Sequence, residues 1–284
     1  MLHTEWSLVF FTTIAQWAAG IMIAVLPFVF AKNQNRFAKL NHTAFYFAAG
    51  LIFGALVLSF FHLNNPVNAF YALGNLETSW LSWEILLVSV FLFCLVLVNL
   101  ILHIKTPEAI YYKTFILVTA IMGVIMVYTM SQLYMIPTVP AWNGISTMIE
   151  FYSTALLMGA TFVLGLSFHY RTKTNQKIAP ANKTRVVVSI ALLAVVLILI
   201  NVLFFNQPVK QANIAFKPEP LNQSFLFLRW ITIALGAGSM FYIIHKRDRL
   251  KNMRLAFYLP FAFFLISELI ARAAFYASFY RIGL

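Results

Sequence analysis

The chain has 284 residues, of which 62% are apolar and only 10% are charged, and its formal net charge is +12 at pH 7. A water-soluble fold of this composition would expose more apolar surface than soluble proteins tolerate, so a soluble domain is excluded. The Lys and Arg residues lie in short segments between apolar runs rather than on one surface, which argues against nucleic-acid binding. The sequence therefore predicts an integral membrane protein.

The apolar runs are continuous over about twenty residues, the length of a helix that crosses a bilayer, whereas barrel strands would alternate over about ten. We predict an all-α polytopic membrane helical bundle that forms a single integral-membrane domain over residues 1–284. The run after Met1 to Trp6 is too long for a cleaved signal peptide, so it is expected to remain as the first span. The eight predicted transmembrane helices are 8–30, 42–62, 81–104, 114–135, 146–169, 186–206, 225–244 and 255–279.

The basic residues indicate how this bundle is oriented. Fifteen Lys and Arg residues lie in the first, third, fifth and seventh connections, and only Lys210 and Lys217 lie in the other three. Because positively charged connections stay in the cytoplasm, the odd connections are predicted to be cytoplasmic. Both the N and C termini are then periplasmic.

Small and aromatic residues give packing predictions. Gly50 and Gly54 are expected to form a close-contact face on the second span. Inspection reveals no internal repeat, so the inverted repeats of many transporters have no support. Tryptophans near the outer span ends are expected to form an interfacial belt, with the members Trp6, Trp80, Trp83, Trp142 and Trp230.

Ionisable side chains at membrane depth carry the functional signal, because each is costly there unless it is paired or faces water. On the predicted topology they all fall in the external half of the bundle, near one face. These residues are His62, Glu84, Glu150, Arg229, Glu268 and Arg272. The sequence therefore predicts a site near the outer face.

Structural roles also fit several of these residues. Glu84 lies near a helix start, where a carboxylate is favoured by the helix dipole and by capping. Glu268 and Arg272 stand four residues apart with the acid first, which suits an ion pair on one helix face. Arg229 could instead extend its side chain to the outer interface.

Metal and haem sites are not expected on this protein. His62 has no second histidine at its depth to complete a bis-histidine haem, and no metal site is predicted. Cys94 is the only cysteine, which excludes an intramolecular disulfide and any iron–sulfur cluster held by this polypeptide alone.

Two sequence blocks are distinctive. One runs from His62-Leu-Asn-Asn-Pro66 through Asn75-Leu to Ser79-Trp-Leu-Ser-Trp-Glu-Ile85, and the other is Ser267-Glu-Leu-Ile-Ala-Arg-Ala-Ala-Phe-Tyr276. Both blocks resemble the membrane anchor subunit of bacterial dimethyl sulfoxide reductase, with which the length and the predicted eight spans also agree. The sequence departs from that family at Asn64-Asn65, usually Gly and a basic residue, and at Trp83, often Arg.

The resemblance implies that the protein binds and oxidises menaquinol in the bacterial inner membrane during anaerobic respiration. Electrons would pass to a subunit with [4Fe-4S] clusters and then to a molybdopterin catalytic subunit, both periplasmic, that reduces S- or N-oxides. The same resemblance associates His62 and Glu84 with the quinol site and implies no haem.

A mechanism follows from these two residues. We expect His62 to accept a hydroxyl proton and Glu84 to orient the quinol or relay a proton. The remaining four ionisable residues would line or brace the cavity. The loop 63–80, with Pro66 and Phe70, is expected to contact the partner subunits.

Two other functions stay open on the sequence. A polytopic transporter could use the same six ionisable residues as a charged external-side binding site, although a transporter favours a site near the midplane. A passive anchor would carry no quinone chemistry, in which case replacing His62 would leave electron flow intact.

Overall fold

The computed structural model describes residues 6–32, 36–60, 71, 73–104, 110–174, 181–205, 220–246 and 254–279. All regular structure in these ranges is helical, which confirms the all-α prediction. The long helices are α1 Trp6–Val29, α2 Ala38–Phe60, α4 Trp80–Ile104, α5 Ile110–Tyr134, α6 Ile145–Thr174, α7 Ala181–Ile200, α8 Pro220–Lys246 and α9 Leu259–Ala277. Short helical turns are η2 Leu73–Asn75, η3 Asn201–Phe205 and η4 Arg254–Tyr258.

Eight of these helical segments are long and apolar enough to cross a membrane, and each corresponds to one predicted span. The observed helices often begin earlier than predicted; α2, for example, starts at Ala38 rather than at residue 42. The reason is that a hydropathy pattern stops at the first polar side chains, whereas the backbone hydrogen bonds of a helix continue through them.

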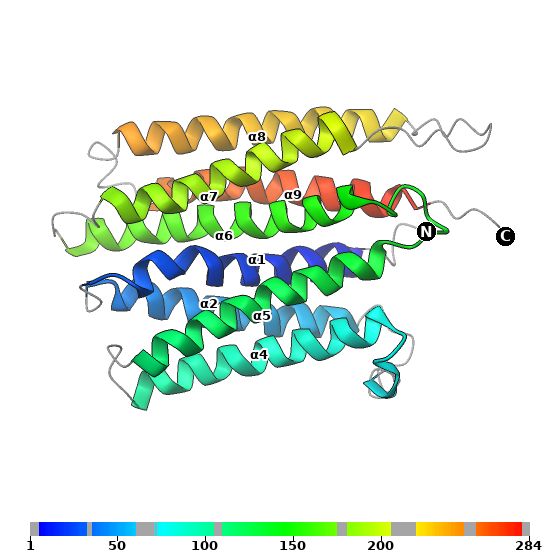
Figure 1. Ribbon diagram of the computed structural model, residues 1–284. Helices are drawn as coiled ribbons and strands as arrows, with labels where there is room; N and C mark the ends of the chain where they lie inside the picture. The colour runs from blue at the N-terminus through cyan, green and yellow to red at the C-terminus, as the bar shows by residue number, and fades with distance from the viewer. Residues whose placement is uncertain are drawn as a thin grey trace.

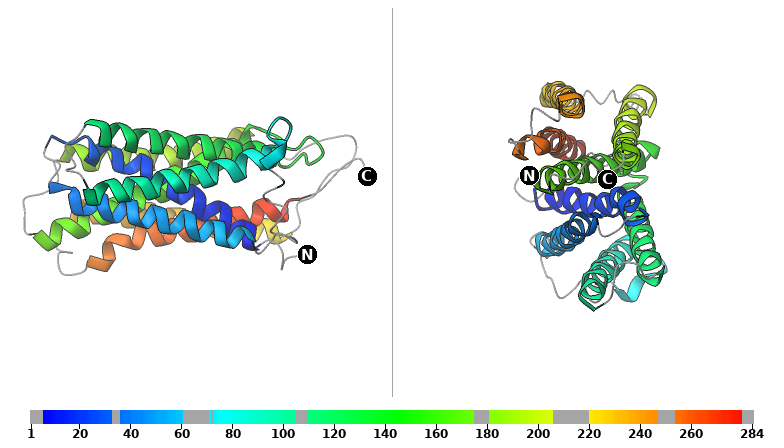
Figure 2. Two further views of the ribbon diagram at one scale, coloured as in Figure 1. Left: turned by 90° about the horizontal axis from the view of Figure 1, so that it is seen from below. Right: turned by 90° about the vertical axis from the view of Figure 1, so that its left-hand side faces the viewer.

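The helices form two groups of four that meet at the contact between α1 and α6 (Figure 1). One group holds α1, α2, α4 and α5, and the other holds α6, α7, α8 and α9. The end-on view separates them clearly (Figure 2, right). The packing of α1 on α2 and of α4 on α5 recurs as α6 on α7 and α8 on α9, and the contacts α1–α5 and α1–α9 recur as α6–α9 and α6–α5. The contact of α2 with α4 has no comparable counterpart between α7 and α8 in the described part of the protein, so the two groups share part of a parallel repeat that inspection of the sequence did not reveal.

Two glycines allow α1 and α6 to cross closely. A Cβ atom on Gly20 would lie 1.7 Å from the Ala155 carbonyl oxygen, and one on Gly159 would lie 2.0 Å from the Gly20 carbonyl carbon. By contrast, nothing in the described part of the protein lies within 4 Å of a Cβ built on Gly50 or Gly54. The predicted close-contact face on α2 is therefore wrong, because no helix lies against that face there.

Helix α1 begins and helix α9 ends at the same end of the bundle, which we call the proximal end (Figure 1, right). Exposed Trp6, Trp80 and Trp83 lie at this end. Trp142 does not fit the predicted belt, because it is only 7% exposed and its Nε1 donates to the Phe275 carbonyl oxygen at 2.8 Å. Its ring stacks on Phe275, so Trp142 belongs to the core.

Candidate functional site

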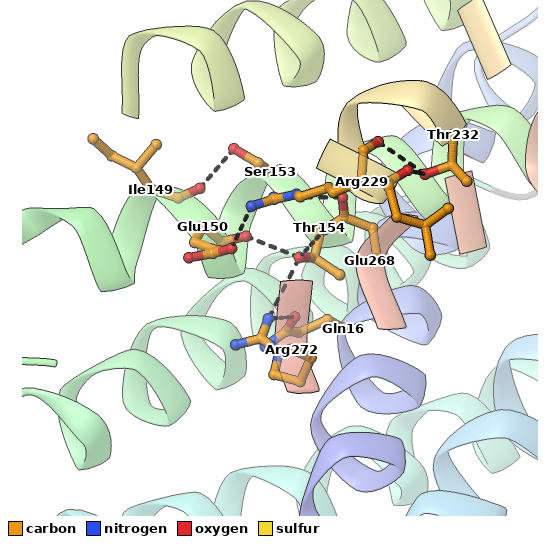
Figure 3. A network of polar contacts seen from close by, with 10 residues as sticks. Gln16, Ile149, Glu150, Ser153, Thr154, Arg229, Thr232, Glu268 and Arg272 are labelled. Carbon is orange, nitrogen blue, oxygen red and sulfur yellow. Dashed lines mark hydrogen bonds and ion pairs between the residues drawn. The ribbon is translucent and has the colours of Figure 1, made fainter. Parts of the chain in front are cut away.

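Four of the six predicted site residues come together in one buried network, shown in Figure 3. Glu150 comes from α6, Arg229 from α8, and Glu268 and Arg272 from α9. Glu84 lies on α4, apart from this network, at the same end of the bundle. The other predicted residues, His62, Pro66 and Phe70, lie outside the described residues.

Arg229 lies between two carboxylates. Its Nη1 donates to Glu150 Oε1 at 3.0 Å, and its Nη2 lies 3.7 Å from Glu268 Oε1. The Arg229 residue is only 5% exposed, so the predicted extension to the outer interface is wrong. These contacts link α8 to α6 and α9 through charge.

Arg272 does not form the predicted ion pair with Glu268. Its Nη2 instead donates to Gln16 Oε1 at 2.7 Å and lies 3.4 Å from Thr154 Oγ1. Its guanidinium carbon lies 3.9 Å from the centre of the Phe151 ring. The side chain points toward α1 and α6, which gives Arg229 of α8 the place beside Glu268 (Figure 3).

Several buried donors in this network lack hydrogen-bond partners in the described part of the protein. They are Nε and Nη1 of Arg272, Nε2 of Gln16 and Nε of Arg229. Arg272 is 1% exposed and Gln16 is fully buried. Since buried polar groups are nearly always satisfied, these donors indicate bound water or a ligand with acceptor atoms.

The network arises from polar residues spaced four apart on three facing helices. This spacing puts side chains on one face of a helix, one above the other. The rows are Thr12 and Gln16 on α1, Glu150 and Thr154 on α6, and Glu268, Arg272 and Tyr276 on α9. Because α1, α6 and α9 pack on one another, the three rows meet.

A pair of tyrosine hydroxyls lies closer to the proximal end. Tyr276 donates to the Tyr134 hydroxyl at 2.8 Å and lies 3.4 Å from Thr12 Oγ1. Both tyrosines are buried, and Tyr134 makes edge contacts with the rings of Trp142 and Phe275. They stand at corresponding ends of α5 and α9, so the pair joins the two groups of helices.

Glu84 is 4% exposed, and its Oε1 has no hydrogen-bond partner in the described part of the protein. Capping does not account for it, because Ser79 Oγ already accepts from the Ser82 backbone N–H at the start of α4, at 3.3 Å. Glu84 lies near the start of α4, and α4 packs on α5, the helix that ends at Tyr134.

The arrangement suits hydrogen bonding and proton transfer. It combines carboxyl groups, hydroxyls and unsatisfied donors in a setting enclosed by aromatic rings. Among the described residues, no group of three or more His, Cys, Asp or Glu side chains could hold a metal ion.

Sequence reasoning missed Gln16, Thr154, Tyr134 and Tyr276 because it considered only acids, arginines and histidines within the spans. For two of them a signal was present. Thr154 lies four residues after Glu150, and Tyr276 lies four residues after Arg272, so each shares a helix face with a predicted site residue.

Comparisons with known proteins agree on one family. A family model described as DMSO reductase anchor subunit (DmsC) matches residues 1–278. The C subunit of an anaerobic dimethyl sulfoxide reductase from Haemophilus influenzae is 31% identical over 57% of the present sequence and 58% of its own. YnfH, a subunit of an anaerobic dimethyl sulfoxide reductase from Escherichia coli, is 34% identical over 55% of each sequence.

The relatives match over little more than half of their length. The C subunit of a second Escherichia coli anaerobic dimethyl sulfoxide reductase behaves in the same way, with 30% identity over 55% of each sequence. No solved structure gives a significant match to this protein.

Proposed function

The protein belongs to the DmsC family of DMSO reductase anchor subunits, multi-pass proteins of the bacterial membrane, and from this membership we propose that it oxidises menaquinol. The two electrons pass to an iron–sulfur subunit with [4Fe-4S] clusters. A molybdopterin catalytic subunit then uses them to reduce an S- or N-oxide. Quinol binds at the proximal end, which faces the periplasm.

The observation that carries this proposal is the burial of Glu84 with an unpartnered carboxyl oxygen, on the helix that packs against the α5 of Tyr134. A buried polar group without a hydrogen-bond partner lowers the stability of the protein. Ionisable groups in such unfavourable surroundings are common at functional sites. An acceptor oxygen at this place suits the hydroxyl of a quinol.

His62 supplies the second acceptor in this proposal. It follows the last residue of α2, Phe60, by two positions, and α2 packs on α4, the helix that carries Glu84. His62 takes the proton from one quinol hydroxyl, and Glu84 orients the quinol or takes the other proton. The network of Glu150, Arg229, Glu268 and Arg272 braces the helices around the site.

Electrons and protons leave this site on the same side of the membrane. The loop 63–80, including Pro66 and Phe70, contacts the partner subunits there. Turnover by this subunit therefore moves little net charge across the bilayer. Membrane lipid and quinone are its other partners.

The test compares quinol oxidation in membranes that hold the wild-type protein, His62→Ala or His245→Ala at equal subunit levels. His245 is an exposed histidine at the distal end, the opposite end of the bundle, so its replacement is a matched control. Binding of a fluorescent quinone-site inhibitor is measured in parallel. The proposal requires His62→Ala to lose both oxidation and binding while His245→Ala keeps both; equal behaviour of the two variants contradicts it.

A transporter is the second candidate, and the two-group architecture favours it, because parallel repeats also build transporters. The polar network extends toward the middle of the spans, with Gln16 lying inside α1, which begins at Trp6. The same experiment separates the candidates. A transporter predicts no quinol-dependent electron flow to partner subunits from the wild-type protein.

A further inference from the structure

We propose that Glu268 is a proton-loading group on an internal path that leads away from Glu84. The path begins at the hydroxyl pair of Tyr134 and Tyr276, reaches Glu268 through the Arg272 region, and opens beside Glu150. This inference rests on the proposed function, because quinol oxidation is the reaction that releases protons near Glu84. Oxidation of one quinol yields a quinone, two protons, and two electrons for the iron–sulfur acceptor, so the path carries protons only.

The carboxyl group of Glu268 keeps a hydrogen bond whether or not it holds a proton. Thr154 Oγ1 lies 2.6 Å from Glu268 Oε2 and 2.9 Å from the Glu150 carbonyl oxygen. The ionised carboxylate accepts from the Thr154 hydroxyl. The protonated acid donates to Thr154 Oγ1, and the threonine then donates to the Glu150 carbonyl oxygen. Gaining a proton therefore leaves no new group unsatisfied at this contact.

The charged side chains around Glu268 are also compatible with protonation of its carboxylate. Arg229 faces it from α8 at 3.7 Å but holds its closer contact, 3.0 Å, with Glu150 of α6. Arg229 therefore keeps a counter-ion when Glu268 is protonated. Arg272, on the same helix as Glu268, bonds to the neutral Gln16 side chain of α1 and stacks on a ring of α6. No other described acid or base forms an ion pair with Glu268.

The section between the tyrosine pair and Glu268 is lined by unsatisfied donors. Tyr276 reaches Thr12, and one helical turn deeper the same two helices present Arg272 and Gln16. Nε and Nη1 of Arg272 and Nε2 of Gln16 lack partners in the described part of the protein. Water bound to these buried donors would continue the line of hydrogen bonds from the tyrosine hydroxyls to the Glu268 carboxyl group.

The path opens at Glu150. The Glu150 side chain is 14% exposed, whereas that of Glu268 is fully buried. Glu150 lies near the start of α6, at the proximal end, so a proton that leaves Glu268 returns to the side where quinol is oxidised.

The test uses the intact reductase complex in proteoliposomes, driven by a menaquinol analogue. Infrared difference spectra and proton release are recorded for wild type, Glu268→Gln, Glu268→Asp, Tyr276→Phe, the double variant of Glu268→Gln with Tyr276→Phe, and Tyr111→Phe. Tyr111 is an exposed tyrosine at the start of α5, outside the network, and serves as the control. We expect the carboxylic C=O band that appears during turnover to be lost in Glu268→Gln, kept in Tyr111→Phe, and restored in shifted form by Glu268→Asp.

Proton release should slow by about a hundredfold in Glu268→Gln, the lower end of what a positioned proton-transfer group contributes. The double variant should be no slower than the slower single variant, because both groups lie on one path. If the wild-type complex does not oxidise quinol, both the proposed function and this inference are contradicted. Normal wild-type oxidation with an unchanged band and release rate in Glu268→Gln overturns this inference alone. If Glu268→Gln does not assemble, Tyr276→Phe decides: an unchanged release rate there also overturns it.

Discussion

The two buried arginines differ in how their charge is balanced. Arg229 contacts carboxylates of two helices, whereas Arg272 has no carboxylate within ion-pair distance in the described part of the protein. Breaking a buried ion pair leaves an uncompensated charge, while removing an unpaired cation takes away a group that was itself costly to bury. The consequences of replacing each arginine should therefore differ.

Replacing Arg229 with Met should lower the free energy of unfolding by about 3–5 kcal/mol, because Glu150 and Glu268 lose their shared counter-ion. Thermal unfolding of the purified protein in detergent measures the effect. Arg272→Met keeps an apolar stem on Phe151 and should cost less. Equal losses in the two variants would contradict this description of the network.

Glu84→Gln separates a functional role from a structural one. The amide has nearly the same shape, and the Glu84 carboxyl Oε1 has no hydrogen-bond partner in the described part of the protein, so stability should stay unchanged or rise. Quinol oxidation should fall by about a hundredfold or more. Both are compared with the wild type at equal subunit levels; a destabilised Glu84→Gln with normal oxidation per folded molecule would assign Glu84 to structure.

At this scale the sequence predicted which charged side chains gather at one end of the bundle better than it predicted their partners. Glu150, Arg229, Glu268 and Arg272 could be selected because charge in an apolar run is unusual. The pairing of Glu268 with Arg229 could not, because it depends on how α8 and α9 are rotated against each other. Neutral Gln16 gave no such signal until α9 placed Arg272 beside it.

At the scale of elements, the crossing of α1 and α6 holds the two groups together. The helices themselves were predictable, because continuous apolar runs of spanning length specify them. The choice of contacting faces was not, since pairs of small residues occur at several places and only packing decides which pair meets another backbone. Gly50 and Gly54 illustrate this, because their face of α2 meets no neighbouring helix among the described residues.

Gly20→Ala and Gly159→Ala should each destabilise the bundle by about 1–3 kcal/mol or more, because the added methyl group meets backbone atoms that cannot rotate away. Gly50→Ala and Gly54→Ala add the same methyl group in open space and are the controls. The measurement is the unfolding temperature in detergent. Similar temperatures for all four variants would show that the close crossing is absent.

At the scale of the whole molecule, the repeat brings α5 and α9 to corresponding positions, so their terminal tyrosines meet where the two groups join. The hydropathy pattern could not show this symmetry, because the two groups share an arrangement of helices and no similarity between their residues is evident. Because the number of candidate spans is eight, an even number, the first span begins and the last span ends on the same side of the membrane. The side itself is predicted only from the basic connections.

Single cysteines introduced into a Cys94→Ser background test that orientation. Asn143→Cys lies at the proximal end, between α5 and α6, and Lys32→Cys lies at the distal end, and both positions are exposed. A membrane-impermeant maleimide added to intact cells whose outer membrane is permeabilised should label position 143, and position 32 only after lysis. The reverse labelling pattern would mean that the bundle has the opposite orientation, with the proposed site on the cytoplasmic side.

The central claim is that a quinone binds at the proximal end, between Glu84 and the tyrosine pair. The most direct measurement is photolabelling of the membrane-bound complex with an azidoquinone, followed by peptide mapping. The account predicts labelled peptides from the start of α4 and the ends of α5 and α9, with protection by excess menaquinone. Protected labelling confined to the distal end, around His42 and His103, would contradict it.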